Sequence, residues 1–287
     1  MTILDGKALS EKIVDEISTQ VKRLKAQGRR VPGLGVVLVG DDPASHTYVK
    51  MKEKTCQRVG FLSKVVRLQE NTTQKELLKT VRAMNEDDTI DGILVQLPLP
   101  PHLDTTEILE SINPSKDVDG FHPYNFGRLV QGLESFVPCT PLGVIELLKE
   151  YGIDPKGLDC CVVGASNIVG KPMAALLLNS FATVDVCHIY TKDLKRHTLC
   201  ADMVIVGVGK KGLIKEDMVK EGAIVVDIGI NKLSNGKIVG DVDFDNVSKK
   251  CSYITPVPGG VGPMTIAMLM KNTLKAYYNL TRSKDTV

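Results

Sequence analysis

The chain of 287 residues lacks the features that mark several common classes of protein. It has no excess of one charge, because 36 basic and 34 acidic side chains leave a net charge of +2, and no basic stripe that would bind nucleic acid. No uncharged apolar run approaches the roughly 18 residues that span a bilayer. Charges interrupt residues 1–12, where a secretory signal would be apolar. We therefore expect a cytoplasmic protein whose partners include neither nucleic acid nor membrane.

Cysteine and histidine are equally unpatterned. The seven cysteines form no CxxC pair, and neither they nor the five histidines show the spacing of metal ligands, so we expect no metal site. An odd number of cysteines fits a reducing, intracellular compartment in which the thiols serve as small core residues. No ordering of serine, histidine and aspartate suggests a covalent nucleophile.

The chain does have the length and composition of a globular protein with two domains, at 43% hydrophobic and 24% charged residues. In its first part, strands predicted at 34–39, 61–67 and 91–97 alternate with helices. Such alternation is typical of a parallel α/β layer. Thr73, followed three residues later by Glu76, predicts a capping box at the start of one of these helices.

A less periodic stretch at 113–138, rich in Asn, Pro and Gly, suggests a domain boundary. The part that follows predicts a second α/β unit, opened by a helix that Thr140 and Pro141 start. Its short apolar strands are expected near 159–163, 184–190, 203–208 and 223–228.

A glycine turn lies in the second unit. Residues 160–172 read CCVVGASNIVGKP, a buried strand, a tight turn and then a helix, which is where a dinucleotide fold holds pyrophosphate. The spacing departs from G-x-G-x-x-G, because Gly164 and Gly170 are present but Ser166 stands where the middle glycine would be. A purely structural turn is the alternative interpretation.

The end of the following strand indicates which dinucleotide is bound. An NAD site usually places Asp or Glu there, against the ribose 2′-hydroxyl, whereas this chain has Tyr190, Thr191 and Lys192. A hydroxyl and a cation suit a 2′-phosphate, so the sequence predicts NADP. The alternative is that Thr191 and Lys192 only form a solvated turn.

Three polar residues of the first unit are candidates for catalysis. Tyr48 and Lys52 lie four apart on a predicted helix and therefore share a face, although an ordinary amphipathic helix often shows that spacing. Gln96 lies near the carboxyl end of a strand in the same layer, where open α/β sheets bind ligands. The loop KDVDGF adds Asp117 and Asp119, which could also be plain turn formers.

The stretch ITPVPGGVGPMT at 254–265 carries three prolines, three glycines and no charge. Proline stiffens the chain, and glycine allows another surface to approach closely. A stiff, apolar loop before a helix suggests the wall of a ligand site, and a buried loop that only packs is the other interpretation.

Six segments in order resemble bifunctional methylenetetrahydrofolate dehydrogenase/methenyltetrahydrofolate cyclohydrolase, over essentially the whole chain. One departure is that some members carry Arg after the first glycine of the cofactor loop, where this chain has Ala165. The segments are SHTYVKMK (45–52), VQLPLP (95–100), KDVDGF (116–121), PCTP (138–141), GASNIVGKP (164–172) and ITPVPGGVGPMT (254–265).

The resemblance implies two α/β domains flanking a cleft, the second a Rossmann-like dinucleotide-binding domain. Residues 1–120 and 265–287 would form the folate-binding domain and 121–264 the NADP-binding domain. The enzyme would oxidise 5,10-methylenetetrahydrofolate with NADP⁺ and hydrolyse the methenyl product to 10-formyltetrahydrofolate. The family is dimeric through its cofactor domain, so a homodimer is expected.

The resemblance also implies roles for single residues. Lys52 would assist the addition of water, Gln96 would hold Lys52 or the water, and Tyr48 would offer its ring to the folate. Asp119 would accept hydrogen bonds from the pterin, beside a loop of Pro258, Gly259 and Gly260. The implied cofactor-binding residues are Gly164, Ala165, Ser166, Thr191, Lys192 and Ile230, the last beside the nicotinamide half.

Three rival interpretations remain. A short-chain dehydrogenase also uses Tyr-x-x-x-Lys, but there the glycine loop precedes the pair, whereas Tyr48 precedes Gly164 here. An enzyme like shikimate dehydrogenase has similar architecture, but no matching substrate motif is present. A non-catalytic NADP sensor would keep 164–172 without needing Lys52, Gln96 and Asp119 together.

Overall fold

The computed structural model describes residues 1–285, so the last two residues of the predicted 265–287 segment lie outside it. It divides into two compact units, which we name by their sheets. The three-stranded unit comprises Glu11–Arg128, Ser135–Val137 and Ile266–Val287, and the six-stranded unit comprises Met1–Ser10, Leu129–Glu134 and Pro138–Thr265. Within residues 1–285, no helix is both long enough and apolar enough to cross a membrane.

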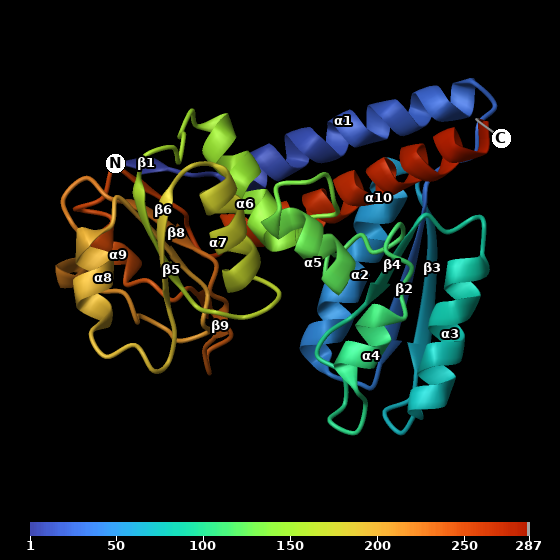
Figure 1. Ribbon diagram of the computed structural model, residues 1–287, viewed down its shortest axis with the longest axis horizontal. Coiled ribbons are helices and arrows are strands. Elements are labelled where there is room, and N and C mark those ends of the chain that lie inside the picture. The colour runs from blue at the N-terminus through green and yellow to red at the C-terminus, as the bar shows by residue number, and fades with distance from the viewer. Residues whose placement is uncertain (286–287) are drawn as a thin grey trace. The chain divides into compact units, whose positions relative to one another are not determined.

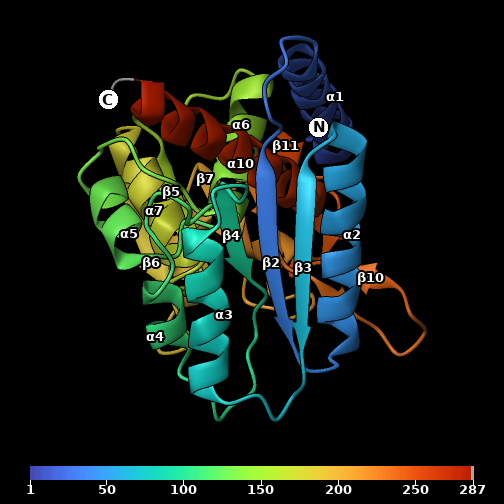
Figure 2. The same cartoon turned by 90° about the vertical axis from the view of Figure 1, so that its right-hand side faces the viewer.

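The three-stranded unit has a parallel sheet in the order β3-β2-β4. Its central strand β2 (Gly33–Val39) is buried throughout, between β3 (Leu62–Leu68) and β4 (Gly92–Val95) (Figure 2). The helices α2 (Pro43–Val59) and α3 (Gln74–Glu86) lie on opposite faces of this sheet (Figure 1). The alternation predicted for this part of the chain is therefore confirmed.

Local sequence signals fix the ends of these two helices. The carboxylate of Asp42 accepts a hydrogen bond from the Ser45 N–H at the start of α2, and Gly60 ends that helix in the left-handed region at φ 83°. At the start of α3, Thr73 and Glu76 form the predicted capping box. The other helices outside the six-stranded sheet are α1 (Gly6–Ala26), α4 (Thr105–Glu110), α5 (Pro123–Val130) and α10 (Val261–Asp285).

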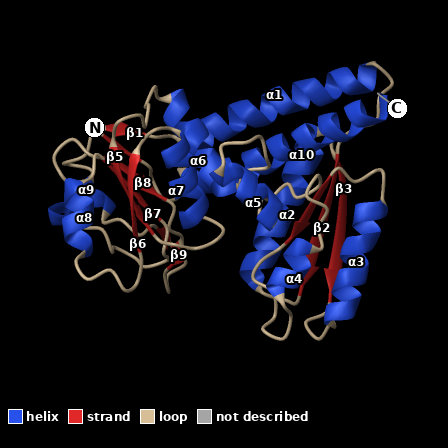
Figure 3. Ribbon diagram, viewed as in Figure 1, coloured by secondary structure: helices blue, strands red, loops and turns tan. Residues whose placement is uncertain are grey.

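The six-stranded unit has a parallel sheet in the order β1-β11-β8-β7-β5-β6. Its helices lie on both faces, with α7 and α8 on opposite sides (Figure 3). The strands are β1 (Thr2–Ile3), β5 (Asp159–Val163), β6 (Thr183–Cys187), β7 (Met203–Val206), β8 (Ile224–Asp227) and β11 (Tyr253–Ile254), with a hairpin of β9 (Asn231–Lys232) and β10 (Ile238–Val239). The helices are α6 (Cys139–Glu150), α7 (Gly170–Asn179), α8 (Leu194–Cys200), η1 (Glu216–Met218) and α9 (Phe244–Val247).

The first strand explains why the unit boundaries differ from the sequence-based segments 1–120 and 121–264. β1 pairs in parallel with β11, with Thr2 opposite Tyr253, so the first residues of the chain extend the sheet of the six-stranded unit. Two residues that pair across such a sequence separation leave no local pattern by which the sequence could reveal them.

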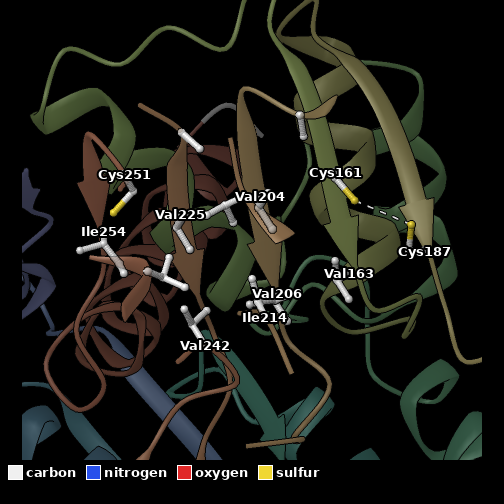
Figure 4. Packing of buried hydrophobic residues seen from close by; sticks show 14 residues of the cluster. Cys161, Val163, Cys187, Val204, Val206, Ile214, Val225, Val242, Cys251 and Ile254 are labelled. Carbon is white, nitrogen blue, oxygen red and sulfur yellow. Dashed lines mark hydrogen bonds between the residues drawn. The ribbon is translucent and has the colours of Figure 1, made fainter. Parts of the chain in front are cut away.

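The core of the six-stranded unit consists of Val, Ile, Ala and Cys side chains (Figure 4). Cys161 and Cys187 lie side by side on β5 and β6 with their sulfur atoms 3.7 Å apart, and burial raises the pKa of both thiols. All seven cysteines are free thiols, and six of them are buried. The predicted role as small core residues is therefore confirmed for these six and is wrong for Cys200, which is exposed.

Candidate functional site

The carboxyl end of the three-stranded sheet brings Lys52 and Gln96 together. Lys52 lies on α2 and only 9% of its surface is exposed. Its Nζ donates a hydrogen bond to Gln96 Oε1 at 3.0 Å. Gln96 Nε2 in turn donates to the Leu97 carbonyl at 2.7 Å, which fixes the amide with its oxygen toward the lysine. The buried Nζ of Lys52 therefore faces a neutral acceptor whose orientation is fixed.

Tyr48 lies one helical turn before Lys52, on the same face of α2. It is half-buried, and burial raises the pKa of its phenol. The hydroxyl therefore remains neutral near pH 7 and is available as a hydrogen-bond donor and acceptor.

The three charged residues of the KDVDGF loop differ in burial: Lys116 and Asp117 are buried and Asp119 is half-buried. The Lys116 ammonium is buried and donates to the carbonyls of Asn85 and Asp87 at 2.8 and 2.9 Å, at the carboxyl end of α3. Asp117 is also buried and accepts from the Asn125 side chain at 2.8 Å and the His122 N–H at 2.9 Å. Burial raises the pKa of this carboxyl, and these donors lower it. Lys116 and Asp117 thus serve to fix the loop.

Asp119 is the third charged residue of the loop that Lys116 and Asp117 fix. It is half-buried and follows the fully buried Val118, whose carbonyl accepts from Asn272 Nδ2 at 2.8 Å. Asp117 forms a parallel bridge to Ile93 of β4, so the loop runs beside β4 toward the end where Gln96 follows. The sequence alone could not distinguish the roles of Asp117 and Asp119, because both are acids in one turn.

In the six-stranded unit, the predicted glycine turn follows β5. A Cβ on Gly164 would lie 2.8 Å from the Gly207 carbonyl, and one on Gly170 would overlap the Gly164 carbonyl. Only glycine permits so close a fold of strand, turn and helix. The turn places the start of α7 at the carboxyl end of the sheet, where dinucleotide folds hold pyrophosphate. Its N–H groups are bonded within the turn, Lys171 to the Ser166 carbonyl at 3.0 Å and Met173 to the Val169 carbonyl at 2.9 Å.

Ser166, which replaces the middle glycine of the common pattern, has a local function. Its hydroxyl accepts hydrogen bonds from the N–H groups of Val169 at 3.2 Å and Gly170 at 3.4 Å. The side chain therefore ties the turn to the start of α7. Ala165 beside it is half-buried and offers no polar group.

The strand predicted at 184–190 ends at Cys187, so Thr191 and Lys192 lie beyond a turn that follows β6 rather than directly at its end. Thr191 Oγ1 accepts from the His188 N–H at 2.9 Å, and the Thr191 side chain also bonds to the Cys187 thiol. Lys192 is exposed. Ile230 follows β8 and exposes 46% of its surface.

The proline- and glycine-rich loop is held rigidly within the six-stranded unit. The Gly259 carbonyl accepts from the Lys7 N–H at 2.8 Å, and the Gly260 N–H donates to the Pro256 carbonyl at 2.9 Å. Pro258, which lies between Pro256 and Gly259 in the sequence, is exposed. Lys7 is a positioning residue that sequence reasoning missed, because a backbone contact between distant segments has no sequence signal.

Comparison with known proteins gives one consistent result. A family model described as tetrahydrofolate dehydrogenase/cyclohydrolase, catalytic domain, matches residues 4–119, and the NAD(P)-binding domain model of the same description matches 138–281. A bifunctional protein FolD from a Nitratiruptor species is 69% identical over 283 residues, which cover 99% of this chain and 100% of that protein.

Solved structures agree with this result. The crystal structure of a bifunctional FolD methylenetetrahydrofolate dehydrogenase/cyclohydrolase from Campylobacter jejuni matches with a TM-score of 0.96 at 61% identity, covering 97% of this chain and 99% of that one. A Trypanosoma brucei N5,N10-methylenetetrahydrofolate dehydrogenase-cyclohydrolase, complexed with NADP cofactor and inhibitor, matches with a TM-score of 0.95 at 38% identity, covering 98% and 99%.

Proposed function

Because the chain belongs to the tetrahydrofolate dehydrogenase/cyclohydrolase family, and is a bifunctional NADP-dependent enzyme of one-carbon folate metabolism, we propose which of its residues carry each reaction. The first reaction oxidises 5,10-methylenetetrahydrofolate to the methenyl form, and the second hydrolyses that product to 10-formyltetrahydrofolate. The observation that carries the proposal is the hydrogen bond of 3.0 Å between the buried Lys52 Nζ and Gln96.

The oxidation requires the methylene carbon to be aligned with the nicotinamide, and it requires little acid–base chemistry. NADP⁺, when bound, accepts a hydride from the methylene carbon, and the remaining cation is stabilised by a neighbouring nitrogen lone pair. The protein contributes by orientation. Gly164, Ala165 and Ser166 would receive the pyrophosphate at the start of α7, and Ile230 would contact the nicotinamide half.

Hydrolysis asks for proton transfer, because water adds to the methenyl carbon and must lose a proton. Lys52, as a neutral amine, would accept this proton, and the Gln96 amide would hold its Nζ in one direction. Tyr48 supplies a ring face and a neutral hydroxyl on the same side of α2. Asp119 would accept hydrogen bonds from the pterin N–H groups. That Pro258, Gly259 and Gly260 contact the folate stays a prediction.

An assay of the purified chain tests the two activities directly. Mixed with NADP⁺ and 5,10-methylenetetrahydrofolate, the protein is expected to produce reduced-nicotinamide absorbance, and without NADP⁺ it should hydrolyse methenyltetrahydrofolate. A chain that reduced NADP⁺ but never hydrolysed the methenyl compound would refute the role proposed for Lys52 and Gln96.

Thr191 and Lys192 would bind the 2′-phosphate of NADP. We expect Lys192→Ala to raise the KM for NADP⁺ roughly tenfold, since one charge-assisted hydrogen bond contributes about 1.5 kcal/mol, and to leave the KM for NAD⁺ unchanged. The matched control is Lys195→Ala, whose exposed ammonium pairs with Asp217 at 2.6 Å. If the KM values for NADP⁺ and NAD⁺ rose equally in Lys192→Ala, Lys192 would not bind the 2′-phosphate.

A cytoplasmic homodimer completes the proposal. β6 is the last strand of its sheet, and the exposed fractions of Phe181 (76%), Val186 (41%) and Ile189 (90%) leave apolar side chains on and beside it. Such an edge is suited to a second copy of the chain. Sedimentation equilibrium is expected to give twice the monomer mass, and Val186→Lys to shift it toward the monomer. A wild-type chain that sediments as a monomer at micromolar concentration would contradict the dimer.

A further inference from the structure

Two buried carboxylates of the six-stranded unit have no part in the chemistry described so far. Asp227 is the last residue of β8 and is 3% exposed, and Asp241, which follows β10, is fully buried. Both lie at the carboxyl end of the sheet. Burial of a carboxylate is costly unless hydrogen-bond donors compensate for the lost water, and both acids have such donors.

Asp241 fixes the turn that follows β7. Its Oδ2 accepts from the N–H groups of Val208 at 2.7 Å and Gly209 at 2.9 Å. Its Oδ1 accepts from Asn231 Nδ2 at 2.8 Å, in the segment that follows Ile230. One carboxylate therefore joins the turn after β7 to the segment after β8.

Asp227 holds Asp241 in place. Its Oδ1 accepts from the N–H groups of Gly229 at 2.9 Å and Asp241 at 3.0 Å, and its Oδ2 accepts from the Val242 N–H at 2.9 Å. The backbone N–H of Asp227 donates to Thr255 Oγ1 at 2.7 Å, just after β11. The two acids therefore connect the ends of three adjacent strands.

Two glycines allow the backbone to reach these carboxylates. A Cβ on Gly229 would overlap the Asp241 carboxyl group, and one on Gly240 would overlap the Asp227 carboxyl group. No other residue fits at either position without moving the acid it faces. The acids and the backbone around them therefore form one closely fitted assembly.

The charges of the pair are held by backbone donors. Burial raises the pKa of Asp227 to about 6, and the three N–H groups that it accepts from oppose this shift. The carboxylate is therefore mostly ionised at neutral pH. An apolar side chain at either position would leave without acceptors the buried N–H groups that now donate to the two carboxylates.

The turn that Asp241 fixes lies beside the cofactor loop. The Gly207 carbonyl, one residue before Val208, approaches Gly164 so closely that a Cβ there would lie 2.8 Å away. On its other side, Asp241 fixes Asn231, the neighbour of the exposed Ile230. In open α/β sheets, the ligand lies against the carboxyl ends of such strands.

We propose that Asp241, held by Asp227, is a positioning residue for hydride transfer: it fixes the Val208–Gly209 turn and the segment of Ile230 against the nicotinamide half of NADP. This inference rests on the proposed function, which places the nicotinamide half beside Ile230. Neither acid touches the reacting atoms in this account, and both act through the backbone that they hold.

The test compares two activities of the same full-length protein. Asp241→Ala is expected to lower the kcat of NADP⁺-dependent oxidation roughly 100-fold, as a displacement of about 1 Å can do, and to raise the primary deuterium isotope effect because hydride transfer becomes slower. Cofactor-free hydrolysis of methenyltetrahydrofolate is expected to be unchanged. Asp241→Asn should fall between, since its remaining oxygen can still accept from Val208 and Gly209.

Asp243→Ala is the matched control. Asp243 lies two residues after Asp241, and its carboxylate accepts a hydrogen bond from Asn246 Nδ2 at 2.8 Å. It should leave both activities unchanged. Oxidation and hydrolysis that fall in equal proportion in Asp241→Ala, or an unchanged isotope effect, would reduce Asp241 to a structural residue and overturn the inference.

Amide hydrogen exchange without cofactor separates this inference from the proposed function. The N–H groups of Val208 and Gly209 are expected to exchange faster in Asp241→Ala and at the wild-type rate in Asp243→Ala. Unchanged exchange in Asp241→Ala would overturn the inference. A wild-type chain that reduced no NADP⁺ would overturn the proposed function, and the exchange rates would still decide whether Asp241 holds the turn.

Discussion

Replacing Lys52 with methionine is expected to lower the hydrolysis of methenyltetrahydrofolate by roughly 10²–10⁴-fold, the contribution typical of one positioned acid–base group. Methionine fills much of the volume of the lysine side chain without its amine. Oxidation needs alignment and no proton transfer from Lys52, so methenyl product should accumulate with one reduced nicotinamide for each methenyl group. Absorbance recorded at the bands of both products measures the two reactions in one sample.

Lys50→Met is the control for this experiment, because Lys50 lies on the same helix and is exposed. It should hydrolyse at the wild-type rate. If Lys52→Met also hydrolyses at that rate, Lys52 has no part in the mechanism. If oxidation is lost together with hydrolysis, the substitution has disturbed the binding of folate itself.

Replacing Asp119 with alanine is expected to raise the KM for folate roughly 30-fold, since hydrogen bonds to a charged group contribute about 1.5–3 kcal/mol. The KM for NADP⁺ should change little, because the residues proposed to bind the cofactor lie in another part of the chain. Both constants come from initial-rate measurements in which one substrate is varied at a time.

Asp117→Asn is the informative comparison for Asp119. Asp117 is buried and accepts from backbone and side-chain donors, so its loss is expected to lower the melting temperature and both activities together. Asp119→Ala should lower the melting temperature less than Asp117→Asn does, because Asp119 is only half-buried. An Asp119 variant that loses affinity for folate and NADP⁺ in equal measure would show that this acid is structural as well.

Much of the fold follows from local patterns in the sequence. The capping box at Thr73 and Glu76 and the alternation of strands and helices depend on neighbours within one or two turns, and they lie where the sequence predicts. The shared face of Tyr48 and Lys52 follows from the helical repeat alone. Gln96 could be placed near that face because parallel strands end at one edge of a sheet.

The features that escaped prediction depend on contacts between distant segments. The pairing of β1 with β11 joins Thr2 to Tyr253, and the contacts of Asp241 with Val208 and Gly209 cross more than thirty residues. The sequence could not distinguish Lys116 and Asp117, which fix the loop, from Asp119, because burial depends on tertiary contacts. Asp241 is fully buried, and its neighbours in the sequence hardly indicate this burial.

The central claim is that the Lys52 amine faces the one-carbon unit of the folate. A crystal structure of the protein with NADP⁺ and a non-reactive folate analogue measures this directly. We expect Lys52 Nζ within hydrogen-bond reach, about 3 Å or one bridging water, of the position that the attacking oxygen would occupy, while Gln96 still accepts from it. An analogue bound with its one-carbon position remote from Lys52, and with another titratable group beside it, would contradict the account.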